Sequence, residues 1–289
     1  MSRLLITGAT GNIGSSIIRF LMESDTTNEI IAAVRDIDKA KSLFPDYEKL
    51  NYVYFDFENP ASFRDATHNI DRIFLLRPPQ ISNVEKYFRP LIEVLKEQQV
   101  REIIFLSVQG AEKSKVIPHN KIESLIKAFK FDYIFLRPGY FMQNLTTTLL
   151  GDIKTKRKII LPSGTAKFNW IDIENIGETC SILLNHFYEF KNQAIELTGY
   201  ENENFFKVVD LINASISRPI HFVNVKPFRF YSIKKKDGMK IGLIIVMIML
   251  HILPRFQKEP KISDFYEKLT GKKPTKLIDF IMREREKFE

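Results

Sequence analysis

The first half of the chain alternates short apolar runs with amphipathic stretches. The runs predict strands at 3–7, 29–34, 51–55, 72–76, 101–107 and 132–137. Apolar residues at helical spacing lie between most of them, as over 84–99 and 120–129. Strands joined by helical crossovers form a parallel sheet with helices on both faces. We therefore predict an α/β fold of the Rossmann type, with a doubly wound parallel sheet.

The pattern becomes less regular toward the C-terminus. We expect residues 1–150 to form the first domain, with 172–199 returning to it. Residues 151–289 should form mainly a smaller α+β subdomain that binds substrate, with a helix over 206–216 and a strand over 221–225.

The run 241–253 is apolar on all sides and too short to span a bilayer as a helix. It favours a buried helix or a lid over an apolar substrate. A membrane-surface anchor is the alternative, because Lys234, Lys235, Lys236 and Lys240 precede the run.

A glycine turn follows the first predicted strand, and apolar residues at helical spacing follow the turn. The turn reads Gly8-Ala9-Thr10-Gly11-Asn12-Ile13-Gly14. Gly8 permits a tight turn, Gly11 lets a pyrophosphate approach the backbone, and Gly14 lets the helix pack close to the sheet. The helix N-terminus then offers N–H groups to phosphates. An ordinary strand–helix turn is the alternative, but this context favours a dinucleotide cofactor.

The tip of the second predicted strand bears on the choice of cofactor. Arg35 stands where an NAD-selective site usually has a carboxylate for the ribose 2′-OH. A guanidinium suits a 2′-phosphate, so we expect NADP(H), with NAD(H) the less favoured cofactor. Asp36 is the competing residue and would favour NAD, and a solvated Arg–Asp pair is the third interpretation.

Ligands of such sheets bind at the carboxyl ends of the strands. The candidate cofactor-binding residues already named are Arg35 and those of the turn: Gly8, Thr10, Gly11, Asn12, Ile13 and Gly14. The rule adds residues that follow the other strands: Asp56, Phe57, Leu76, Arg77, Pro78, Ser107, Val108, Tyr140 and Phe141. Tyr140 and Phe141 are expected to face the nicotinamide or the substrate, with packing in the core as the alternative.

Segments along nearly the whole chain resemble the NmrA-like group of atypical short-chain dehydrogenases/reductases. The matching segments are 6–14, 34–36, 74–79, 104–111, 136–144, 169–177, 195–199 and 269–274. The family usually has Asp-Ile-Gly where this chain has Asn175-Ile176-Gly177. The resemblance implies an NADP(H)-binding Rossmann domain and a small C-terminal subdomain that forms one wall of a cleft. Some members reduce quinones or other small electrophiles, and others bind the cofactor without turnover as regulators.

The proton donor of the wider superfamily, a Tyr-x-x-x-Lys pair, is missing from its expected segment. That segment, 117–123, has no tyrosine, and Tyr231 with Lys235 lies well outside the nucleotide core. His119 is the best substitute, since a histidine with a pKa close to neutrality can donate a proton or hold a substrate oxygen. A structural hydrogen bond at a helix start is the alternative role for His119. Lys121 is a weaker candidate.

Composition narrows the other possibilities. The single cysteine, Cys180, excludes an internal disulfide and is expected to be a packing residue. The five histidines do not have the spacing of metal ligands, so we predict no metal. The net charge of +8 is interpreted as dispersed and partly explained by an anionic cofactor, without a nucleic-acid partner. Met1-Ser2-Arg3 leads directly into a strand, which predicts a cytoplasmic protein without a transmembrane segment.

The function predicted from the sequence is hydride transfer from NADPH to a quinone or similar apolar small molecule. A non-catalytic NAD(P)(H) sensor that binds a protein partner is the alternative. A homo-oligomer or another protein partner stays open.

Overall fold

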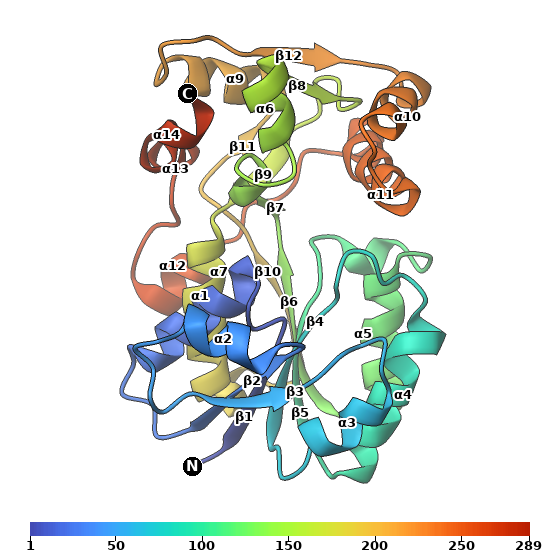
Figure 1. Cartoon of the computed structure of the whole chain (residues 1–289), viewed down its shortest axis with the longest axis vertical. Coiled ribbons are helices and arrows are strands. Elements are labelled where there is room, and N and C mark those ends of the chain that lie inside the picture. Colours follow the sequence, from blue (N-terminus) through green and yellow to red (C-terminus); the bar gives the residue numbers. More distant parts are fainter. The chain divides into compact units, whose positions relative to one another are not determined.

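A computed structural model describes residues 1–289, and the chain divides into two units (Figure 1). The first unit contains Met1–Pro138 and Ile173–Leu197, and the second contains Gly139–Asp172 and Thr198–Glu289. The first unit ends at Pro138 rather than at the expected residue 150. The reason is that Tyr140, two residues beyond Pro138, pairs with Trp170 in a small sheet of the second unit.

Seven parallel strands form the sheet of the first unit, in the order β10-β6-β5-β4-β1-β2-β3. Their bounds are β1 Arg3–Thr7, β2 Glu29–Val34, β3 Asn51–Tyr54, β4 Arg72–Leu76, β5 Glu102–Leu106, β6 Asp132–Pro138 and β10 Gln193–Leu197. The prediction of a doubly wound parallel sheet is confirmed. Each of the six predicted strands agrees to within one residue at either end. The seventh strand, β10, was not predicted as a strand.

Helices cover both faces of this sheet. They are α1 Asn12–Met22, α2 Ile37–Leu43, α3 Ala61–Ala66, α4 Val84–Glu97, α5 Pro118–Ala128, α7 Ile173–Asn185 and α8 Phe187–Phe190, with a 3-10 turn, η1, at Ala111–Lys113. Figure 1 shows α1 and α7 on one side of the sheet, and α3, α4 and α5 on the other.

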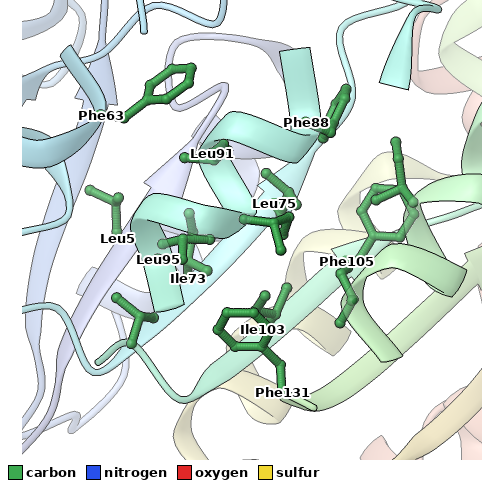
Figure 2. Close-up of a cluster of buried hydrophobic side chains, with 14 of the residues drawn as sticks. Leu5, Phe63, Ile73, Leu75, Phe88, Leu91, Leu95, Ile103, Phe105 and Phe131 are labelled. Carbon is green, nitrogen blue, oxygen red and sulfur yellow. The ribbon is translucent and has the colours of Figure 1, made fainter. Parts of the chain in front are cut away.

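Alternate residues of the central strands pack against opposite layers of helices. Leu5, Ile73 and Ile103 lie in register on β1, β4 and β5, and they join a core with α3, α4 and α5 (Figure 2). Their neighbours Leu4 and Phe74 are equally buried but lie outside that cluster. Burial on both faces explains why these strands read as continuous apolar runs.

The opposite layer depends on a close contact between α1 and α7. A Cβ at Gly177 of α7 would lie 2.2 Å from Oγ of Ser16 on α1, so only glycine fits there. This contact accounts for the glycine of the Asn175-Ile176-Gly177 segment. Cys180, one turn further along α7, is fully buried, and burial raises the pKa of its thiol.

The second unit contains two small sheets and several helices. The strands are β7 Tyr140–Phe141, β8 Lys158–Leu161, β9 Phe168–Ile171, β11 Asn202–Glu203 and β12 His221–Asn224. The helices are α6 Leu150–Lys156, α9 Phe205–Asn213, α10 Pro227–Lys236, α11 Ile241–Ile252, α12 Phe265–Thr270, α13 Leu277–Arg283 and α14 Arg285–Phe288, with 3-10 turns η2 Met142–Asn144 and η3 Leu253–Phe256. An aromatic cluster of Tyr140, Phe168, Trp170 and Phe205 lies in its core.

The expectation that the apolar run 241–253 forms a buried helix is wrong. The run does form a helix, α11, but only Ile244, Met247 and His251 are buried on it. These residues recur at helical spacing and therefore occupy one face, while apolar side chains elsewhere on α11 are exposed. None of the helices is both long and apolar enough to cross a membrane.

Candidate functional site

The strand order of the first unit reverses between β1 and β4, which are neighbours in the sheet although two strands separate them in the chain. In a doubly wound sheet this point opens the crevice where ligands bind. The glycine turn follows β1 and Arg77 follows β4. Arg35, Asp56 and Ser107 follow β2, β3 and β5, so the parallel sheet brings all five predicted positions to one edge.

Two of the three glycines are required by the backbone itself. Gly8 has φ +64°, and a Cβ there would lie 2.6 Å from Cδ2 of Leu76. A Cβ at Gly14 would lie 2.3 Å from the backbone oxygen of Gly8. Gly11 differs, because its φ of −86° suits any residue and a Cβ would lie 3.3 Å from that oxygen. The absence of a side chain at Gly11 therefore chiefly keeps space open above the turn.

The N-terminus of α1 lacks a side-chain cap. Gly11 occupies the N-cap position with extended backbone, and no side chain accepts a hydrogen bond from the first turn. Uncapped N–H groups and the helix dipole together favour an anion such as a phosphate. Thr10 and Asn12 are exposed beside this terminus, whereas Ile13 is buried and offers its backbone alone.

At the tip of β2, the two competing residues have different surroundings. The Asp36 carboxylate accepts a hydrogen bond from the backbone N–H of Lys39 at 3.0 Å and so caps α2. Arg35 is exposed and forms no ion pair. The carboxylate that would favour NAD therefore has a structural role, and the guanidinium is available to a ligand.

The two predicted residues after β3, Asp56 and Phe57, also have different surroundings. Asp56 is half-buried, and its Oδ1 accepts a hydrogen bond from the Glu58 N–H at 2.9 Å. The ring of Phe57 lies in the hydrophobic core, 4.9 Å from that of Phe55 and 5.2 Å from that of Phe88. The Phe57 ring therefore does not contact a ligand, and only the Phe57 backbone is suited to do so.

Arg77 fixes the loop after β4. Its Nη1 donates to the carbonyl oxygens of Pro78, Pro79 and Ile81, the last at 2.7 Å. Its Nε donates to Nε2 of His119 at 3.3 Å. The guanidinium is therefore occupied largely by the protein and holds His119 at the start of α5.

His119 does not titrate near neutrality as expected. Burial, together with the neighbouring Arg77 guanidinium, lowers the pKa of His119 to about 3. Because Nε2 accepts from Arg77, the neutral ring carries its proton on Nδ1. His119 can thus offer a neutral N–H to a substrate oxygen, but it is not an imidazolium acid at pH 7.

Ser107 belongs to a buried polar network that the sequence did not reveal. Its hydroxyl donates to Glu123 Oε1 at 2.6 Å, and Arg137 binds both oxygens of the same carboxylate. Arg137 also binds Glu112 at 2.8 Å. Glu123 lies one helical turn after His119 on α5, which is the one sequence signal that could have linked the two residues. Val108 is half-buried beside the network.

The same edge of the sheet holds a carboxyl group with an altered pKa. Glu196 lies near the end of β10, opposite Arg137 in the register. Burial and the nearby Glu112 carboxylate raise its pKa. The sequence reasoning missed this residue because β10 was not predicted as a strand. No group of three or more His, Cys, Asp or Glu side chains is placed to hold a metal.

Tyr140 and Phe141 lie in the second unit, on β7. Tyr140 is 8% exposed, and its hydroxyl lies 3.1 Å from Nε2 of His251. Its ring meets that of Trp170 edge to face at 4.8 Å, and burial raises the pKa of its phenol. The expectation that the Tyr140 ring faces a ligand is therefore corrected, since the ring is part of the core. Phe141 is half-buried.

The sequence model of the NmrA-like family matches residues 1–281 of this chain. The chain belongs to this family. Prestalk A differentiation protein A from Dictyostelium discoideum is 27% identical over 96% of this chain and 90% of that protein. The NAD(P)H azoreductase of Xenophilus azovorans is 25% identical over 96% of both chains.

The fold of this chain is also similar to that of a solved structure. The NADPH-dependent quinone oxidoreductase from Escherichia coli, complexed with NADPH, superposes with a TM-score of 0.83 at 19% identity. The match covers 97% of this chain and 99% of that one. At this identity the likeness shows a shared fold.

The glycine turn gives a matched pair of substitutions. Gly14→Ala should lower the free energy of unfolding by about 1–3 kcal/mol, because its Cβ meets backbone that cannot move aside. Gly11→Ala should cost less than about 1 kcal/mol but weaken nicotinamide-nucleotide binding at least about tenfold, since the methyl group fills the approach to the turn. Urea denaturation and titration calorimetry measure the two effects. Equal loss of stability in both variants would contradict this division of roles.

The lowered pKa of His119 gives a pH prediction. The unfolded chain binds a proton at this histidine near pH 6.5, whereas the folded chain does so only near pH 3. The free energy of unfolding should therefore fall as the pH drops from about 6.5 toward about 3, and His119→Asn should remove part of that acid sensitivity. NMR should show no titration of the His119 ring between about pH 5 and 9. A midpoint between about pH 6 and 8 would refute this account.

Proposed function

We propose that this protein binds NADP(H) and passes hydride from NADPH to a quinone or a similar apolar electrophile. The uncapped N-terminus of α1, at the point where strand order reverses, is the observation that carries the proposal. Gly8 and Gly14 hold the turn against the helix, and Gly11 leaves room for a pyrophosphate. The proposed cofactor-binding residues are those of the turn with Arg35 and Asp56, and the backbone near Leu76, Pro78 and Val108.

Arg35 supports the choice of NADPH over NADH. Its guanidinium is exposed and unpaired at the tip of β2, where a 2′-phosphate would lie. The adjacent Asp36 is held as the cap of α2 and does not compete for a ribose 2′-OH.

The surroundings of His119 support an acceptor that needs little acid catalysis. Quinones and azo compounds accept hydride from the cofactor with little help from protein side chains. His119 has a pKa of about 3, so it can orient a substrate oxygen through a neutral N–H rather than transfer a proton as a cation. The names of the azoreductase and quinone oxidoreductase relatives agree with this substrate class.

Turnover of NADPH with a panel of quinones and azo dyes tests the activity. We expect oxidation of NADPH, followed at the absorbance of the reduced nicotinamide, well above the rate without protein. His119→Gln should change KM more than kcat. The amide holds the substrate oxygen in a different position, but it retains a neutral hydrogen-bond donor and no proton-transfer step is lost. Tight NADPH binding without turnover on quinones, azo dyes, aldehydes or enones would instead favour a cofactor sensor that binds a protein partner.

The role of Arg35 is tested separately by binding. Arg35→Ala should weaken NADPH binding by about 1.5–3 kcal/mol and leave NADH binding nearly unchanged, because the lost interaction is a charged hydrogen bond to the 2′-phosphate. Arg101→Ala is a matched control, since Arg101 is an exposed cation directly before β5, at the opposite edge of the sheet. Equal losses for both cofactors would exclude Arg35 as the selective residue.

A further inference from the structure

Nearly all of the net positive charge comes from one segment of the second unit. Residues 226–258 contain eight Lys or Arg residues and a single acid, Asp237, a formal balance of +7 against +8 for the whole chain. The charge is thus clustered rather than dispersed as expected. Lys234 is buried against Asp152. The other seven cations are exposed and form no ion pair: Lys226, Arg229, Lys235, Lys236, Lys240, Arg255 and Lys258.

The same segment exposes an unusual amount of apolar surface on α11 and the residue after it. Seven aliphatic or methionine side chains there are between 38% and 51% exposed: Ile241, Leu243, Ile245, Val246, Met249, Leu250 and Leu253. At 3.6 residues per turn they fill a continuous arc of about 200° around the helix. Ile244, Met247 and His251 fall within the remaining arc and attach the helix to the core.

Two exposed aromatic side chains precede and follow this helix in the sequence. Phe228 on α10 is 81% exposed and Phe256 at the end of η3 is 82% exposed. We call these two residues, the seven exposed side chains of the α11 arc and the seven cations the basic apolar surface. An exposed apolar patch bordered by charge marks an interaction site rather than ordinary surface.

We propose that the basic apolar surface docks on an anionic lipid bilayer. A helix that lies in the plane of a membrane interface buries an apolar face among acyl chains and holds Lys and Arg near the headgroups. The 12 residues of α11 extend about 18 Å, enough for such contact but too short to span the bilayer. The exposed arc faces away from the core of its unit, as docking requires.

Charge distinguishes this partner from a second copy of the chain. Two copies that met through the basic apolar surface would bring fourteen unpaired cations together, which opposes self-association. An anionic bilayer instead supplies opposite charge and an apolar layer at once. An acidic protein would satisfy the cations but has no evident need for aliphatic side chains around more than half of a helix.

Vesicle sedimentation of the full-length protein tests the proposal. Binding is expected to vesicles of phosphatidylcholine with about one-third phosphatidylserine, and much less to phosphatidylcholine alone, because the serine lipid supplies the negative surface potential. Raising the salt from about 0.05 M to about 0.3 M should weaken binding by screening. Circular dichroism and thermal unfolding, measured in parallel, confirm that each variant is folded and keep this outcome independent of the proposed cofactor binding and enzymatic activity.

Two groups of variants separate the charged and apolar contributions. Lys235→Gln, Lys236→Gln and Lys240→Gln combined should weaken vesicle binding roughly 100-fold, at about fivefold per lysine. Ile245→Ser with Met249→Ser should weaken it at least about tenfold through lost apolar contact. The matched controls are Lys115→Gln with Lys154→Gln and Lys207→Gln, and Val116→Ser with Met282→Ser, which change exposed residues elsewhere and should bind as the parent does.

Three results would overturn the proposal. The first is no binding to the anionic vesicles at low salt. The second is equal loss of binding in the control variants. The third is tight binding to soluble polyglutamate that the Ile245 and Met249 substitutions leave unchanged, which would assign the surface to an acidic protein instead of a bilayer.

Discussion

The approach of the first turn of α1 to the backbone of Gly8 is the constraint on which the first unit depends. A single methyl group at Gly14 would come within 2.3 Å of the Gly8 oxygen, so the helix starts in direct contact with the loop that precedes it. From that position α1 presents Ser16 to α7, and the bare Cα of Gly177 receives it. The chain leaves α7 through α8 to form β10 at the end of the sheet. Two glycines far apart in sequence therefore determine how one layer of helices lies on the sheet.

Two arginines at the carboxyl edge of the sheet are held by other parts of the protein. Arg137 binds Glu123 and Glu112, and Arg77 is tied to three carbonyl oxygens and to His119. Removing such charges from water is costly, so these networks contribute more to position than to stability. The result is an edge with fixed polar groups and no histidine cation at neutral pH. A site of this kind suits chemistry that a cofactor supplies and the protein orients.

The parts of the structure that the sequence predicted depend on local pattern. A strand buried on both faces is a continuous apolar run, so β1, β2 and β4 were placed without error, and the resemblance to the NmrA-like family is confirmed. The turn after β1 was equally evident, because Gly8, Gly11 and Gly14 recur at every third residue directly after the strand. The environment of His119 was not, since its pKa depends on Arg77, 42 residues away, and on burial beside Phe105. Tyr140 and α11 show the same limit, because hydropathy does not tell which side chains the tertiary fold will cover.

The position of the only thiol has a consequence for chemical durability. Quinones are Michael acceptors that add to thiolates, and an exposed low-pKa cysteine would be alkylated by such a compound over repeated encounters. Cys180, on α7, has no exposed surface. Burial raises the pKa of its thiol, so the group stays in the protonated, unreactive form. A quinone that reaches this protein therefore meets no exposed nucleophilic sulfur.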